Sequence, residues 1–143
     1  MRVTVLGPAS EVLAPTQLPF FKSGVRAGFP SPADDYLEGN ICLQDLLVEN
    51  PAATFLVRVE GHSMKDSGIL DGDIAVVDRS IHPTSGKIVV AVVDGEFCIK
   101  RLIYRGGKCY LQSSNTTFPE IEVSEHSENS VWGAVAHVIH KLR

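Results

Sequence analysis

The sequence has little that would mark a membrane or secreted protein. Its longest apolar run, residues 88–93, is far shorter than the ~18 residues that a membrane-spanning helix needs. The opening segment, MRVTVLGPAS, lacks the apolar stretch of roughly 7–15 residues that is typical of a secretory signal. We therefore expect a cytoplasmic protein that contacts no membrane.

Cysteine is scarce and is not arranged for metal binding. The chain has 3 cysteines, Cys42, Cys98 and Cys109, with no C-x-x-C spacing. A disulfide framework or a zinc site is therefore not expected, and reduced thiols are typical of the cytosol. His137 and His140 differ by an odd number on a predicted strand, so their side chains face opposite sides. We expect no metal and no cofactor.

Positive charge is also in short supply. The 13 lysines and arginines against 17 aspartates and glutamates give a net charge of −4. This balance argues against a protein whose main surface lies on nucleic-acid phosphates. The length of 143 residues fits one domain of roughly 100–200 residues, and the 44% of hydrophobic residues is ordinary for a globular core.

Proline and glycine divide the chain into two parts. The first 33 residues hold Pro8, Pro15, Pro19, Pro30 and Pro32, out of 8 prolines in the chain. Proline removes backbone donors, and together with the interleaved glycines it disfavours long regular elements. We expect residues 1–33 to form an extended arm and residues 34–143 to form the folded core. Apolar residues in the arm suggest that it docks, although composition alone equally allows a disordered tail.

The core has the pattern of a mainly β protein. One short helix is expected after Asn40, a good N-cap, with apolar spacing at Leu43, Leu46 and Leu47. Alternating or β-branched segments bounded by Asp-Gly and Gly-Gly turns predict the strands. These are residues 55–60, 74–77, 87–93, 96–104, 108–112, 121–123 and 131–139. Short strands separated by turns predict a sandwich or barrel-like core.

Lys100 interrupts the apolar pattern of its strand. Its predicted face also carries Cys98, Leu102 and Tyr104. A charged amine in such surroundings is costly unless it is paired or neutral. Burial can lower a lysine pKa from ~10.4 by up to ~3–5 units, which would make a lysine a usable base. The alternative is an edge-strand lysine whose amine extends to water.

Ser63 directly follows a predicted strand in the segment Gly61-His62-Ser63-Met64. The glycine would let another backbone approach closely. The serine hydroxyl could cap the turn that follows. Alternatively it is a nucleophile beside backbone N–H groups that form an oxyanion hole. A serine nucleophile needs an adjacent base, and Lys100 is a candidate, but the sequence does not show whether the two side chains meet.

Two segments resemble the motifs of the LexA and UmuD family of self-cleaving serine–lysine peptidases. The first is EGHSMKDSGI at residues 60–69, followed by Asp-Gly-Asp, and the second is VVDGEFCIKRL at residues 92–102. The segment AGFPSPA at residues 27–33 resembles the cleavage segment of the UmuD-type members, and the similarity spans about residues 18–143. Both motifs in this order, with an Ala-Gly bond upstream, are highly specific.

The resemblance implies a peptidase fold with a defined site. Ser63 would attack, Lys100 would accept its proton and return it to the leaving amine, and Ala27–Gly28 would be the scissile bond. Small residues on both sides suit a strand that lies extended in a tight groove. Two positions depart from the pattern. Ala27 stands where UmuD-type members can carry cysteine, and His62, to which we assign no role, stands where a polar or acidic residue is common.

The resemblance also implies a role in the response to DNA damage. A LexA-type repressor needs a helix-turn-helix domain before its cleavage site, and no recognition helix fits the proline-rich residues before Gly28. We therefore expect no direct sequence-specific DNA binding. A signal peptidase shares the chemistry but would need a membrane anchor.

The resemblance to UmuD-type proteins implies that this chain forms a homodimer. It also implies that a RecA filament on single-stranded DNA stimulates the chain to cut itself. Residues 28–143 would join a UmuC-type DNA polymerase in error-prone translesion synthesis during the SOS response. Two alternatives stay open, a non-enzymatic binding module that regulates a polymerase and a peptidase that acts mainly in trans.

Overall fold

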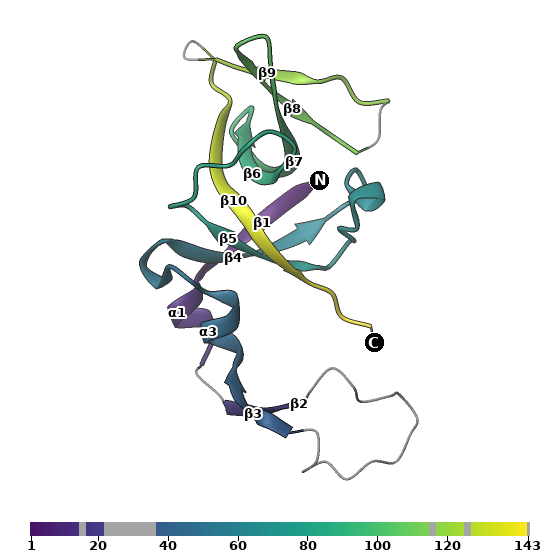
Figure 1. The fold of residues 1–143 in the computed structure, drawn as a ribbon. Coiled ribbons are helices and arrows are strands. Elements are labelled where there is room, and N and C mark those ends of the chain that lie inside the picture. Colours follow the sequence, from purple (N-terminus) through teal and green to yellow (C-terminus); the bar gives the residue numbers. More distant parts are fainter. Residues whose placement is uncertain (15–16, 22–36, 115–116, 125–126, 143) are drawn as a thin grey trace.

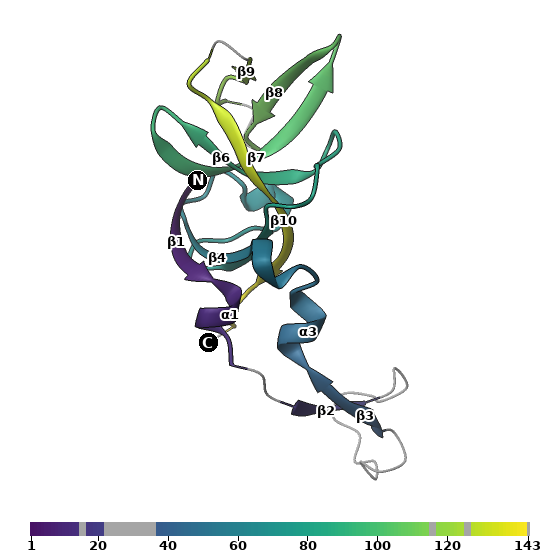
Figure 2. The same ribbon diagram turned by 90° about the vertical axis from the view of Figure 1, so that its left-hand side faces the viewer.

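The computed structural model describes residues 1–14, 17–21, 37–114, 117–124 and 127–142 (Figures 1 and 2). The predicted scissile bond, Ala27–Gly28, lies outside the described residues. So do the arm residues from 22 to 33, and their cleavage stays a prediction.

The main sheet closes on itself. Within the described residues it has 8 strands in the order β1-β4-β5-β10-β6-β7-β8-β9, and β1 also pairs with β7. The bounds are β1 Arg2–Pro8, β4 Thr54–Glu60, β5 Ile74–Asp78, β6 Ile88–Val93, β7 Glu96–Arg105, β8 Lys108–Gln112, β9 Ile121–Val123 and β10 Ser130–Ile139. The strands from β1 round to β7 therefore form a closed barrel, from which β8 and β9 extend (Figure 1).

β-Branched and other apolar side chains fill this barrel. The core cluster consists of Val3, Val57, Val59, Met64, Ile69, Ala75, Val77, Val90 and Ile99. Because side chains alternate along a strand, Val57 and Val59 of β4 both face this interior, and both are fully buried. The core therefore comes from the period-two pattern seen in the sequence, and the prediction of a mainly β, barrel-like fold is confirmed.

The predicted strands from residue 55 onward are found within one or two residues of their expected bounds. The N-terminal segment differs from its prediction as an extended arm. Its first residues form β1, which runs antiparallel to β4 from Arg2↔Glu60 to Pro8↔Phe55. Val3 is buried in the core, with 5% of its surface exposed. A helix of one turn, α1 at Ala9–Val12, follows this strand.

A second, two-stranded sheet lies apart from the barrel. β2 at Gln17–Phe21 pairs antiparallel with β3 at Leu37–Cys42. In both views this hairpin projects beyond α1 and α3, away from the barrel strands (Figures 1 and 2). Pro19 is tolerated because the sheet has only two strands, so each strand has a free edge within the described residues.

The predicted short helix is present as α3, Leu43–Leu47. Its N-cap is Cys42 rather than Asn40, because Asn40 is paired within β3. Leu43 and Leu46 are exposed, so the leucine spacing does not mark a buried face. A short 3₁₀ helix, η1 at Pro51–Ala53, follows α3 and has Asn50 as its N-cap. Among the described residues, no helix has the length and apolarity required to cross a bilayer.

Candidate functional site

Ser63 lies in the turn that follows β4. Gly61, at the end of that strand, has a φ of +105°, which favours glycine. A Cβ placed on Gly61 would lie 3.7 Å from Met1 Cα, so the backbone of Met1 is the one that approaches here. Met64 is fully buried, and its Sδ accepts a hydrogen bond from the backbone N–H of Ser114 at 3.4 Å. The residues on both sides of Ser63 are therefore fixed.

Two aspartates hold the loop between β4 and β5. Asp71 Oδ1 accepts the N–H of Gly61 at 2.8 Å. Asp73, with 1% of its surface exposed, accepts the N–H of Leu70 at 2.9 Å and contacts His140 Nδ1 at 2.6 Å. His140 thus pairs with a carboxylate and links the end of the described chain to this loop.

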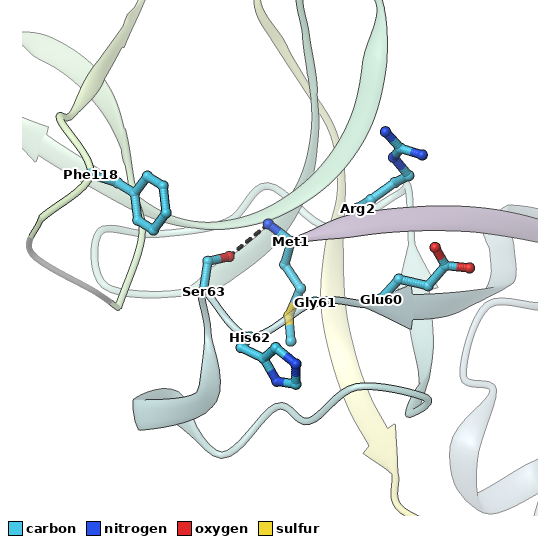
Figure 3. A pocket seen from close by; sticks show the side chains of 7 residues that line it. All are labelled: Met1, Arg2, Glu60, Gly61, His62, Ser63 and Phe118. Carbon is cyan, nitrogen blue, oxygen red and sulfur yellow. Dashed lines mark hydrogen bonds between the residues drawn. The ribbon is translucent and has the colours of Figure 1, made fainter.

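The hydroxyl of Ser63 faces the start of the chain. The nitrogen of Met1 donates a hydrogen bond to Ser63 Oγ at 2.6 Å (Figure 3). The 3₁₀ helix that follows, η2 at Lys65–Ser67, has no side-chain cap, which disfavours the interpretation of Ser63 as a capping residue. Ser63 and Met1 line an open pocket of about 590 Å³ together with Phe118.

Lys100 lies in the middle of β7, opposite the fully buried Val89 of β6. Its Nζ donates a hydrogen bond to Ser113 Oγ at 2.7 Å. Ser113 follows β8 directly and has 3% of its surface exposed. The amine of Lys100 therefore has a buried partner, which disfavours the interpretation of an amine that extends freely into water.

Met1 contacts both Ser63 and the strand that carries Lys100. Its carbonyl oxygen accepts the N–H of Ile99, the neighbour of Lys100, at 2.9 Å. Burial lowers the pKa of the Met1 α-amine below its ordinary value, and the nearby Lys100 ammonium lowers it further. Ser63 and Lys100 thus both lie near the nitrogen of Met1. Among the described residues no hydrogen bond joins Ser63 to Lys100, and each side chain has another partner.

Arg101 ties the loop of Ser63 to the strand of Lys100. Its guanidinium donates to Ser67 Oγ of η2 at 2.9 Å and to the carbonyl oxygen of Gly86 at 2.5 Å. Ser67 Oγ also contacts Ser114 Oγ. Arg101 is therefore a structural link across the site.

His62 and Cys98 take no part in these contacts. His62 is exposed and lines the pocket, but its ring points away from the contact between Ser63 and Met1 (Figure 3). Burial raises the pKa of the Cys98 thiol, which therefore stays protonated near neutral pH and is not a rival nucleophile.

Known proteins are similar to this chain over most of its length. Residues 19–136 match the sequence model of a family described as Peptidase S24-like. The chain belongs to the Peptidase S24-like family. Protein ImpA of Salmonella typhimurium is 42% identical over 125 residues, which cover 87% of this chain and 85% of the relative. Protein SamA of Salmonella typhimurium is 40% identical over 139 residues, or 97% of this chain and 96% of the relative.

The LexA repressor of Vibrio cholerae is a further relative, 39% identical over 123 residues. The match covers 86% of this chain and 58% of that repressor. These similarities confirm the resemblance to the LexA and UmuD family. They also support a serine peptidase activity at the level of the family.

Met1 and Ser113 are the site residues that the sequence analysis missed. Ser113 lies opposite Lys100, because the pairing Arg101↔Gln112 continues by one residue past the end of β8. Its polar side chain directly after a strand was a weak signal for this role. The contact of Met1 depends on where β1 lies in the barrel, and no local motif marks it.

Proposed function

We propose that this S24-like chain cuts its own Ala27–Gly28 bond, with Ser63 as the nucleophile and Lys100 as the base. The cut separates residues 1–27 from residues 28–143. The observation that carries the proposal is that Ser63 and Lys100 both lie near the nitrogen of Met1. The match to a peptidase family over residues 19–136 supports the same chemistry.

The proposed reaction has two stages. Ser63 Oγ bonds to the carbonyl carbon of Ala27 while its proton passes to the neutral Lys100 Nζ. The bond between Ala27 and Gly28 then breaks, and the nitrogen of Gly28 takes the proton from Lys100. Water next attacks the ester on Ser63 while Lys100 accepts its proton, Lys100 passes this proton to Ser63 Oγ, and the new C-terminus at Ala27 is released.

Ser113 has a clear part in this scheme. It accepts a hydrogen bond from Lys100 Nζ at 2.7 Å and so restricts an otherwise flexible side chain. The bond is stronger when the amine is charged than when it is neutral. Ser113 therefore favours the moment at which Lys100 has taken the proton of Ser63.

The cellular role follows as part of the same proposal. A RecA filament on single-stranded DNA stimulates the cut in a cytoplasmic homodimer. The trimmed form, residues 28–143, then serves as a subunit of a UmuC-type polymerase in error-prone synthesis past DNA lesions. The similarity to SamA over almost the whole chain supports a protein of this small type rather than a repressor.

Self-cleavage of the purified protein tests the proposal. Alkaline pH favours the neutral form of a lysine amine, so slow cleavage without any partner is expected at about pH 9–10. Mass spectrometry is expected to find a new N-terminus at Gly28. Ser63→Ala and Lys100→Ala should each stop the reaction and keep the thermal unfolding of the parent.

Normal cleavage in either variant would refute the assignment of the two residues. Cleavage at another bond that still depends on both side chains would refute Ala27–Gly28 alone. An intact chain that cuts an added protein would favour action in trans, and an inert chain with the parent fold would favour a binding module.

A further inference from the structure

β1 begins at the candidate nucleophile and leads away from it. The Met1 nitrogen is 2.6 Å from Ser63 Oγ (Figure 3), and the Met1 carbonyl accepts the N–H of Ile99 at 2.9 Å. The residues that follow pair with β4. The start of β1 is thus held between the strand that leads to Ser63 and the strand that carries Lys100.

The direction of β1 is that of a leaving group. When a serine attacks a peptide bond, the residue after the bond keeps its nitrogen beside the serine, and its chain continues from that nitrogen. Met1 places its nitrogen at Ser63, and the chain continues along β4. β1 therefore has the geometry expected for the segment that follows a cut bond.

The hydrogen bonds of β4 show which residues of a neighbouring strand must donate. The N–H of Val59 donates to the carbonyl of Asp73 at 2.8 Å, and the carbonyl of Val59 accepts the N–H of Gly72 at 2.8 Å. The polar groups of Val59 therefore face away from β1. Since these groups alternate along a strand, Arg58 and Glu60 carry the bonds to β1.

Arg58 and Glu60 pair with Thr4 and Arg2 of β1. These two residues of β1 consequently use their N–H groups for β4. Val3, which lies between them, directs its backbone groups to the other side, where Met1 also directs its carbonyl. To pair with β4, a strand in this position needs an N–H at every second residue.

The sequence after the predicted scissile bond meets this requirement. With Gly28 in the place of Met1, Phe29 and Ser31 take the places that donate to β4. Pro30 and Pro32, which have no N–H, take the places of Val3 and Val5, which do not donate to β4. With Phe29 in the place of Met1 instead, both prolines would take the places of Arg2 and Thr4, which donate to β4, and a strand pair does not accept this.

We infer that β1 occupies the groove that binds residues 28–32, and that β1 must leave this groove before the chain can be cut. The inference rests on the proposed function, because it takes Ala27–Gly28 as the scissile bond. The first residues of the chain then compete with its own substrate segment for one edge of β4. The rate of cutting is proportional to the fraction of molecules in which the groove is open.

A reversible cross-link between β1 and β4 tests this competition. Thr4 and Arg58 are both exposed and directly paired, and hydrogen-bonded antiparallel pairs have Cα atoms about 5.5 Å apart, within the range of disulfides. The double variant Thr4→Cys/Arg58→Cys should cut itself at least about tenfold more slowly when oxidised than when reduced, because the link keeps β1 in place. Each single variant, oxidised and reduced in parallel, controls for the oxidant.

Equal rates in the oxidised and reduced double variant would overturn the inference and leave the proposed function standing. A binding measurement covers a reduced double variant that does not cut. The peptide GFPSPA, residues 28–33 with a free amine, is titrated against the double variant carrying Ser63→Ala. Binding to the reduced form alone supports the shared groove even if the chain never cuts itself, whereas equal binding to both forms, or none to the reduced form, refutes it.

Discussion

Ser113 offers the most direct test of how the site holds its base. Its hydroxyl accepts a hydrogen bond from Lys100 Nζ at 2.7 Å, and 3% of its surface is exposed. Ser113→Ala removes this acceptor and little else, because alanine keeps the backbone and the Cβ. The amine of Lys100 then loses its partner within the barrel and gains the freedom of a long side chain.

The size of the effect follows from the type of bond. A hydrogen bond to a charged group contributes about 1.5–3 kcal/mol. Lys100 is only half-buried, so water replaces part of the bond and the lower end, about 1.5 kcal/mol, applies. The bond is strongest after Lys100 has accepted the proton, so most of this energy is lost from the transition state. A loss of about 1.4 kcal/mol corresponds to about a tenfold lower rate.

The assay is the first-order rate of self-cleavage at alkaline pH, followed by gel electrophoresis well below the unfolding temperature. Urea unfolding of the same sample gives the free energy of unfolding, which separates a loss of fold from a loss of positioning. Ser113→Thr retains a hydroxyl and should recover part of the rate. A Ser113→Ala variant that cuts at the parental rate would show that this bond does not position the base.

Two further predictions concern the barrel. Gly133→Ala should lower the free energy of unfolding by about 1–3 kcal/mol, because its Cβ would lie 2.7 Å from Cγ1 of the fully buried Val77. Urea unfolding measures this loss. The double variant Gly133→Ala/Val77→Ala should be less destabilised than the sum of the two single variants, because the smaller side chain removes the clash. Burial raises the pKa of Asp78, but hydrogen bonds, among them one from Asn50 at 2.7 Å, outweigh it and hold the pKa below its ordinary value. This stabilisation is present above the unfolded pKa and is lost as the pH falls through the folded pKa, so Asn50→Ala should cost about 1 kcal/mol in urea unfolding at pH 7 and clearly less at pH 3.

The sequence was sufficient to predict the strands that are joined by short turns. The β-branched run of β6 and the Asp-Gly turn before β7 predicted that hairpin almost residue by residue. β1 was missed although Val3 and Val5 alternate with Arg2 and Thr4, because the prolines that follow outweighed this short pattern. The helix boundary was misplaced at Asn40 because pairing with β2, a tertiary contact, overrode its capping preference.

The candidate site could be predicted only in part for a similar reason. Ser63 and Lys100 stand in recognisable motifs, so the resemblance identified them. Met1 and Ser113 have no motif, and their contacts with the pair span 62 and 13 residues of sequence. Such contacts are set by the order and register of strands, which a single sequence does not reveal.

The position of Met1 gives alkaline pH two opposing effects on the proposed reaction. High pH favours the neutral lysine amine that accepts a proton. The Met1 α-amine, however, has a pKa below its ordinary value of 8.0 when it is docked, because burial and the Lys100 ammonium disfavour its charge. Its docking is therefore most favourable above pH 8.0 and weakens as the pH falls through the lowered pKa. Up to pH 8.0, raising the pH thus favours the neutral base and at the same time stabilises β1 in the groove, so over this range the rate of self-cleavage should rise less steeply with pH in the intact chain than once β1 has been displaced. An activator that removes β1 from β4 would therefore gain most above pH 8.0, where the docking of Met1 is most favourable.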